Sequence, residues 1–145
     1  MTAVDNATSL RECRQAIVMQ HIEAENRHDI EATIATFHRP RYEVNGEPSD
    51  GEEAVRELQQ GLTHGLPDLH AETVRLRHMD DGVLVEGFIT GTHDGEWVGI
   101  APSGIRLDFP VVGIFEFDGD RLLCEKVYLD MATVLTQMGV IPAIS

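Results

Sequence analysis

The sequence predicts an α+β fold in which helices gather on one face of a strongly curved, mostly antiparallel sheet and form a cone-shaped α+β barrel. Two observations predict it. Apolar residues recur with the helical period of 3.6 as far as Leu62, and with the strand period of 2 from Leu69 onward. The tight-turn sequences DDG and DGD then separate neighbouring strands, which is typical of antiparallel hairpins. A cone with one open end is a natural pocket for a small molecule.

Capping residues place the predicted helices. Ser9 is expected to cap a first helix that runs to about Asn26. Asp29 is expected to cap a short second helix, IEATIATF. Ser49 followed by Glu52 forms a capping box, which predicts the start of a third helix with one apolar face. The three helices therefore occupy the N-terminal part of the chain.

The strand pattern fills most of the rest. A short strand is expected around Tyr42–Val44, followed by turn residues. Longer strands are expected in LHAETVRLRHM, GVLVEGFITGTH, IRLDFPVVGIFEF and RLLCEKVYL. Alternation along the first of these puts five side chains on one side of the sheet: His70, Glu72, Val74, Leu76 and His78. The final MATVLTQMG predicts a short helix that Gly139 ends.

Length and composition indicate one domain, 1–145, with no internal repeat. The formal net charge of −14 argues against nucleic acid and anionic membranes as partners but identifies no partner of its own. The small-molecule ligand is expected from the cone-shaped fold. No stretch approaches 18 apolar residues, and the first residues have no basic segment followed by an apolar run. We therefore expect a cytoplasmic protein.

One stripe of the first helix carries ionisable side chains. His21, Glu25 and His28 stand at positions i, i+4 and i+7, within an arc of about 60°. The stripe could face water, or supply ligands to a metal, although a di-iron bundle needs a second E-x-x-H that the chain lacks. We favour a metal-free pocket in which a His–Glu pair holds one tautomer of the histidine.

Other candidates lie in the strand-rich part. Glu86 interrupts the apolar run VLVEGF and lies either in the pocket or on the outer face. His70 is a pocket candidate because its predicted strand face also carries apolar residues. Tyr128 has the same parity as Asp130 and could donate a hydrogen bond to an oxyanion, or simply pack in the core. Trp97 lies on a glycine-rich loop that could fold over the mouth of the cone.

Four stretches carry a family resemblance: "ENRHDIEA", "PDLHAE", "GTHDGEWVGIAPSG" and "FDGDRLLCEKVYLDMATVLTQMG". In this order they cover most of residues 15–139. The chain resembles the SnoaL-like polyketide cyclases, within the superfamily of nuclear transport factor two and the ketosteroid isomerases. It departs from them at Glu25, where many members carry a bulky aromatic residue, so a more polar pocket is expected.

The resemblance implies a cone-shaped fold that is usually dimeric through its sheet, and hence a homodimer. It also implies an intramolecular aldol ring closure that uses neither a metal nor another cofactor. In the family, a carboxylate near the end of the last strand acts as acid and base, and the matching residue here is Asp130. The family's histidines match His93 and His70.

The resulting hypothesis is a metal-free lyase or isomerase that acts on a carbonyl-containing small molecule. Asp130, His93 and His70 are the expected catalytic residues, and Asp130 could instead be the N-cap of the last helix. The expected substrate-binding residues are His21, Glu25, Glu86, Tyr128 and Trp97. Two alternatives stay open: a non-catalytic binding or scaffolding protein, and an enzyme like the epoxide hydrolases or dehydratases.

Overall fold

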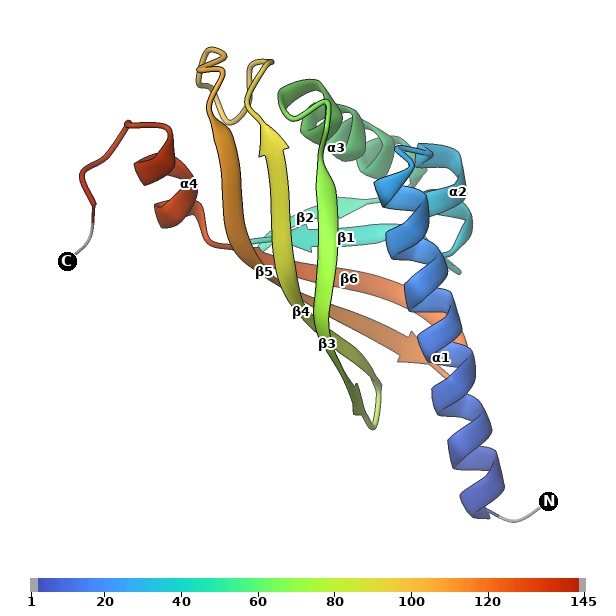
Figure 1. Ribbon diagram of the computed structural model, residues 1–145. Coiled ribbons are helices and arrows are strands. Elements are labelled where there is room, and N and C mark those ends of the chain that lie inside the picture. The colour runs from blue at the N-terminus through green and yellow to red at the C-terminus, as the bar shows by residue number, and fades with distance from the viewer. Residues whose placement is uncertain (1–2, 144–145) are drawn as a thin grey trace.

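The computed structural model describes residues 3–143, which form helices packed against a six-stranded mixed sheet (Figure 1). The helices are α1 (Ala3–Asn26), α2 (Ile30–Ala35), α3 (Glu52–Gly65) and α4 (Met131–Gln137). The strands are β1 (Arg41–Val44), β2 (Glu47–Asp50), β3 (His70–Met79), β4 (Gly82–Thr92), β5 (Arg106–Asp118) and β6 (Arg121–Leu129). The predicted α+β class is confirmed.

The sheet has the strand order β2-β1-β6-β5-β4-β3. All neighbours are antiparallel except β1 and β6, which run parallel. Figure 1 shows the long strands bending strongly, with α1, α2 and α3 along one side and α4 beyond the far end of β6. The sheet does not close on itself, so the structure is an open cone rather than a complete barrel.

Between α2 and α3 the chain forms the hairpin of β1 and β2, where one short strand and then turn residues were predicted. Val44 pairs with Glu47, and Asn45 and Gly46 between them have φ angles of 48° and 86°. Asn-Gly is the strongest short signal for such a two-residue turn, because both positions need a positive φ. The hairpin places β1 beside β6, which is what positions Tyr42 for the site described below.

Two predicted caps differ from the structure. Ser9 lies inside α1, which begins at Ala3, so Ser9 does not cap it. Ser49 belongs to β2, and Gly51 is the N-cap of α3, without a capping side chain. The hairpin explains the second difference, because pairing with β1 extends the strand through the position where the capping box would form.

Two other helix ends agree with the sequence. Asp29 caps α2 by accepting a hydrogen bond from the amide of Ala32 at 3.0 Å. Gly139 follows α4 with a φ of 77°, a left-handed conformation that favours glycine and ends a helix. Asn26 at the end of α1 bonds the backbone of Ala71, donating to its oxygen at 2.9 Å and accepting from its amide at 2.7 Å. The last turn of α1 is thereby fixed against β3.

The core has two apolar clusters. One lies where α1, α2 and α3 meet the sheet, and its buried members include Val18, Ile22, Phe37, Val55 and Phe115. The other lies near α4 and the loop after β4, and its buried members include Leu66, Trp97, Leu107, Phe109 and Val134. Residues of both clusters line the cavity described next, so the cavity lies between them. No helix in the described part of the chain is long and apolar enough to cross a membrane.

Candidate active site

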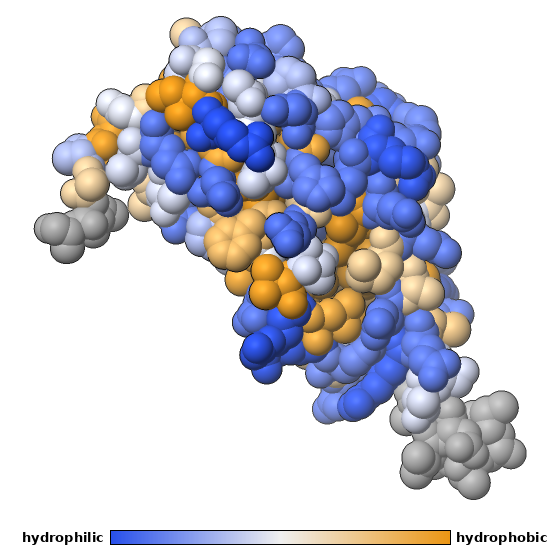
Figure 2. Space-filling view, in the orientation of Figure 1, coloured by the Kyte–Doolittle hydropathy of each residue, from blue (hydrophilic) through white to orange (hydrophobic). Residues whose placement is uncertain are grey.

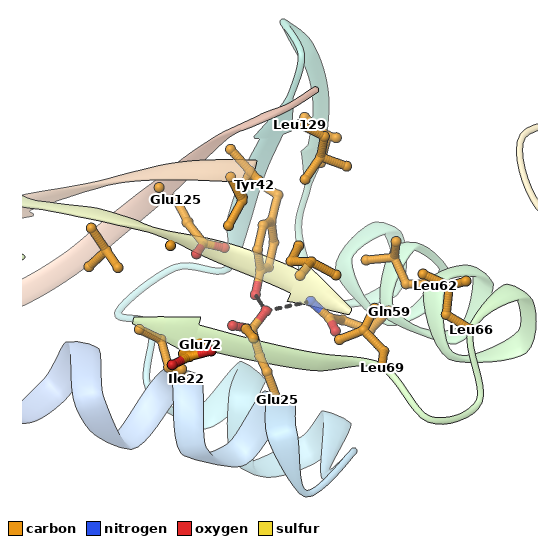
Figure 3. A pocket seen from close by; sticks show the side chains of 18 of the residues that line it. Ile22, Glu25, Tyr42, Gln59, Leu62, Leu66, Leu69, Glu72, Glu125 and Leu129 are labelled. Carbon is orange, nitrogen blue, oxygen red and sulfur yellow. Dashed lines mark hydrogen bonds between the residues drawn. The ribbon is translucent and has the colours of Figure 1, made fainter. Parts of the chain in front are cut away.

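A cavity of about 90 Å³ lies between the sheet and helices α1 and α3 (Figure 3). Its wall is mostly apolar. The polar or charged side chains in this wall are Glu25, Tyr42, Gln59, Thr63, Glu72, Thr73 and Glu125. A small apolar cavity with a few converging polar groups is the usual form of a small-molecule site.

His21 lies directly behind this wall and is completely buried. Its Nε2 atom is 2.8 Å from the hydroxyl of Tyr42, 3.4 Å from Oε1 of Glu25 and 3.6 Å from Oε2 of Glu125. Its Nδ1 atom is 2.7 Å from the hydroxyl of Thr36. Both ring nitrogens therefore have polar partners, and two of these partners are carboxylates.

The directions of these hydrogen bonds fix the protonation of His21. The hydroxyl of Thr36 donates to the carbonyl of Thr33 at 2.7 Å, so its contact with Nδ1 is a bond that Nδ1–H donates. The hydroxyl of Tyr42 donates to Oε2 of Glu25 at 3.1 Å, so Nε2–H donates to the oxygen of Tyr42. With a proton on each nitrogen, His21 is an imidazolium cation.

The charged groups around His21 also favour its protonated form. Burial alone would lower the pKa of His21, but the negative charges of the nearby Glu25 and Glu125 outweigh it and raise this pKa to about 10. Burial would raise the pKa of Glu25, but the charge of His21 and the hydrogen bonds from Tyr42 and Gln59 lower it. His21 and Glu25 therefore form an ion pair at neutral pH.

Glu125 lies beside this ion pair, and its pKa is shifted in the opposite direction to that of Glu25. Burial, followed by the negative charge of Glu25, raises the pKa of Glu125 to about 7, although His21 opposes the shift. Its Oε2 atom is buried without a hydrogen-bond partner among the described residues. Its Oε1 atom lies beside Gly113, where an added Cβ atom would approach to 3.4 Å. Glu125 thus titrates near neutral pH at the wall of an apolar cavity, which suits a general acid/base.

Tyr42 and Gln59 hold Glu25 in place (Figure 3). Gln59 on α3 donates to Oε2 of Glu25 at 3.2 Å, beside the bond from Tyr42. Burial and the charges of the two glutamates raise the pKa of Tyr42 well above its ordinary value, so it stays a hydroxyl and a donor. Glu25 is therefore a fixed counter-ion rather than a proton carrier.

His21, Glu25 and Glu125 are also close enough to one another to bind a metal ion together. Ligand atoms of His21, Glu25 and Glu125 all lie within 4.8 Å of one another. The hydroxyl of Tyr42, however, is hydrogen-bonded to Nε2, the ring nitrogen through which a cation would have to bind. The arrangement as it stands accommodates protons on His21.

Asp130 does not line the cavity, contrary to the acid/base role that the sequence analysis expected. Its carboxylate caps α4, accepting from the amide of Thr133 at 3.0 Å and from the hydroxyl of Thr133 at 2.6 Å. These two bonds hold the pKa of Asp130 below its usual range. Asp130 is thus the N-cap that was the alternative interpretation, and its low pKa does not suit proton transfer at neutral pH.

His70 is exposed and also lies outside the cavity wall. The physical reason is a β-bulge, because the register of β3 against β4 shifts between Thr73 and Arg75. Ala71 and Thr73 line the cavity before the bulge, and Leu76 packs against the core after it, so His70 and Leu76 lie on opposite faces in spite of their equal parity. A bulge interrupts simple alternation, so the single predicted face of β3 is wrong.

His93 is fully buried but is absent from the cavity wall. Its Nδ1 atom is 2.8 Å from the hydroxyl of Ser103 and accepts from the amide of Ser103 at 3.2 Å. These contacts tie together the two ends of the loop between β4 and β5. Trp97 on this loop packs against Phe109, with ring centroids 6.3 Å apart, and borders a second hollow considered below.

Glu86 and Tyr128 lie on the other face of the sheet. Glu86 pairs with Arg77 at 3.8 Å, and its neighbours Val85 and Gly87 line the cavity instead. Tyr128 is 50% exposed, between the cavity residues Val127 and Leu129. Strand alternation explains both positions, since one residue along a strand reverses the face.

Of the predicted residues, His21 and Glu25 come together at the cavity. His28 leaves the stripe because α1 ends at Asn26, and its φ of 57° is left-handed. Its Nε2 atom instead bonds the carbonyl of Leu69 at 2.8 Å.

Sequence reasoning missed Tyr42, Gln59 and Glu125. A signal for Glu125 existed: it shares parity with Val127 and Leu129, an acidic residue on an otherwise apolar strand face.

The open cone and its helices have the fold of the nuclear transport factor two-like proteins, with a mostly apolar cavity inside. A family model described as SnoaL-like polyketide cyclase matches residues 15–138. The chain therefore belongs to the SnoaL-like polyketide cyclase family. A search of curated proteins finds no significant match.

Solved structures show the same fold at low identity. A candidate SnoaL-like polyketide cyclase from Jannaschia sp. CCS1 matches with a TM-score of 0.81 and 21% identity, over 90% of this chain and 94% of that one. IdmH, a candidate polyketide cyclase from Streptomyces antibioticus, gives 0.72 and 22%, over 88% and 99%. AclR, a candidate hydroxylase from Streptomyces galilaeus, gives 0.78 and 23%, over 91% and 84%.

Proposed function

We propose that the protein is a lyase or isomerase of the SnoaL-like type, which catalyses an aldol-type ring closure on a carbonyl-containing small molecule by acid/base chemistry. The observation that carries this proposal is the position of Glu125, a buried carboxyl group in the wall of an apolar cavity whose Oε2 atom has no hydrogen-bond partner among the described residues. Burial and the charge of Glu25 raise its pKa to about 7, which supports the same role. A group with this pKa is available both as base and as acid at neutral pH.

In the proposed reaction, the carboxylate of Glu125 removes a proton from the carbon next to a carbonyl group. The resulting enolate carbon attacks a second carbonyl carbon of the same molecule, which forms the ring bond and leaves an alkoxide. Glu125, now protonated, returns the proton to the alkoxide. The steps balance without an oxidant or reductant, and the proton that leaves carbon ends on oxygen.

His21 and Glu25 have supporting roles in this scheme. The imidazolium of His21, 3.6 Å from Glu125, keeps the pKa of that carboxyl from rising further in its buried environment. Glu25 balances the charge of His21 and is itself held by Tyr42 and Gln59. Neither residue needs to exchange a proton with the substrate.

The first half-reaction can be tested without knowing the natural substrate. A methyl ketone such as 2-acetylnaphthalene exchanges its α-hydrogens with deuterium oxide when a base removes them, and proton NMR measures the rate. The proposal predicts exchange above the buffer rate with the wild type, and exchange at the buffer rate with Glu125→Gln.

Glu86→Gln is the matched control, because it makes the same change on the outer face of the sheet. We expect it to retain the wild-type rate. Equal exchange in wild type and Glu125→Gln would remove Glu125 from the mechanism.

We also propose a homodimer that forms through the outer face of the sheet. Phe88 on β4 and Tyr128 on β6 are 43% and 50% exposed. Their cross-strand partners on β5, Pro110 and Val112, extend the same face. Figure 2 shows apolar side chains gathered over the middle of the molecule, among the otherwise hydrophilic side chains of this view. A second copy with the same patch would cover these side chains.

A further inference from the structure

A second hollow, of about 410 Å³, adjoins the cavity, and we refer to it as the outer chamber. It is bordered by α3, the turn after β1, the loop that carries Trp97, and the start of α4. Its lining residues outside the cavity wall are Asn45, Glu57, Gly61, Trp97, Val98 and Met131. It is more open to solvent than the cavity.

Four apolar side chains border both spaces: Val44, Leu58, Leu62 and Leu129. Each of them is partly exposed rather than buried. A ligand in the outer chamber would therefore touch the same side chains that line the inner cavity. The two spaces therefore share these four side chains as a common boundary.

The volumes of the inner cavity and the outer chamber determine which part of a substrate each of them can hold. A dry cavity of about 150 Å³ is the size that binds benzene. The inner cavity, at about 90 Å³, is smaller and can hold only a compact group such as a carbonyl and its adjacent carbons. Any larger part of the substrate has to lie in the outer chamber.

All the charged side chains in the described walls of the cavity and the outer chamber are acidic. Among the described residues that line them, the charged side chains are Glu25, Glu72 and Glu125 in the cavity and Glu57 in the outer chamber. No lysine or arginine is in either wall as described. A carboxylate or phosphate on the ligand would find no cationic side chain in these walls, and the charge of His21 behind the cavity wall is already balanced by Glu25.

Gly61 on α3 borders the outer chamber. It lies inside α3, where glycine is less favourable than alanine. An added Cβ atom at Gly61 would meet nothing within 4 Å, so the neighbours do not require a glycine there. The missing side chain instead leaves open the space that Leu62 and Trp97 border.

We propose that the outer chamber is a subsite for an uncharged, apolar part of the substrate, and that Gly61 is a specificity-determining residue because its missing side chain admits that part. This inference rests on the proposed function for the position of the reacting carbonyl at Glu125. The chemical class that follows is a neutral ketone with an apolar body larger than one benzene ring.

The chain has a single tryptophan, so one indole NMR signal reports on the outer chamber. The probes are 2-acetylnaphthalene, a neutral ketone, and 2-naphthoate, which has the same ring system and a carboxylate. The proposal predicts a saturable shift of the Trp97 indole N–H signal with the ketone and at least a tenfold weaker response to the carboxylate. An equal response to both, or a response that spares Trp97, would overturn it.

Two leucine substitutions on α3 test Gly61. Gly61→Leu fills the chamber and should weaken binding of the ketone at least tenfold, whereas Gln60→Leu adds the same side chain at an exposed neighbour outside both walls and should leave binding unchanged. Gly61→Gln, with a polar side chain of similar length, should weaken binding as Gly61→Leu does. Unchanged binding in both Gly61 variants, with wild-type melting temperatures, would refute the role of Gly61.

Glu125→Gln separates this inference from the proposed function. If only the acid/base proposal fails, the ketone still shifts Trp97 and Gly61→Leu still weakens binding, while hydrogen exchange is the same in wild type and Glu125→Gln. If only the subsite proposal fails, Glu125 governs exchange, but substitution of Gly61 has no effect on binding.

Discussion

Tyr42 and Glu125 are direct partners in the parallel pairing of β1 with β6, so their side chains leave the sheet side by side and meet His21. The two residues are distant in the sequence and lie in the strands that join the N-terminal hairpin to the long antiparallel strands. This single parallel pairing assembles a tyrosine, a carboxyl group and a buried histidine at one wall of the cavity.

Removing the hydroxyl of Tyr42 should weaken both the fold and the charge state of the site. Tyr42→Phe removes a donor to Glu25 and an acceptor from His21, and we expect a loss of about 1–3 kcal/mol in the free energy of unfolding. Urea denaturation measures this loss. Tyr128→Phe is the control, because the hydroxyl of Tyr128 is on the exposed face, and it should be near neutral. Equal effects of both changes would contradict the hydrogen-bond network.

Glu125 should make the stability of the protein depend on pH in a predictable direction. Its pKa is about 7 in the folded protein and about 4.5 ordinarily, so the folded state holds the proton more tightly. Its contribution to stability is therefore fully present below about pH 4.5 and is lost as pH rises through 7. From pH 4.5 to 8, Glu125→Gln should gain stability relative to the wild type by an amount on the order of 3 kcal/mol.

Urea denaturation of both proteins at several pH values measures this difference. Glu86→Gln, compared in the same way, is the control for loss of a carboxylate on the outer face of the sheet. His21 contributes in the same direction at higher pH: its pKa is raised to about 10, so its stabilisation is present below about pH 6.5 and is lost as pH rises through 10. A constant difference between Glu125→Gln and wild type would show that the pKa of Glu125 is not raised.

Local patterns predicted much of this structure. The period change, the cap at Asp29 and the glycine after the last helix all depend on residues close in sequence, and all three agree with the structure. The pair of His21 and Glu25 was found for the same reason, because one helical turn separates them.

The rest depended on features that a periodic pattern does not contain. The bulge between Thr73 and Arg75 puts His70 on the opposite face of β3 from Leu76. The pairing of β1 with β6 brings Tyr42 beside Glu125. Both are long-range pairing decisions, which one strand's own sequence does not fix. The expected role of Asp130 came from a family resemblance, whereas its contacts with Thr133 are local and are those of a cap.

Asp130 should matter for stability and not for proton transfer. Asparagine is as good an N-cap as aspartate, so Asp130→Asn should keep α4 and lose little stability. Asp130→Ala removes the cap and should cost about 1 kcal/mol. Both variants should retain the wild-type rate of hydrogen exchange on 2-acetylnaphthalene. Loss of that exchange in a folded Asp130→Asn variant would return Asp130 to the mechanism.

A charge on the outer face should separate the proposed homodimer. Tyr128 is 50% exposed and its cross-strand partner Val112 continues the apolar face, so a carboxylate at position 128 would be buried without a partner in a dimer formed there. Light scattering should give twice the chain mass for the wild type and the chain mass for Tyr128→Glu. Met19→Glu is the control, because Met19 is also exposed but belongs to α1, and this variant should stay dimeric. A monomeric wild type at micromolar concentration, or a dimer that persists in Tyr128→Glu, would show that this face is not the interface.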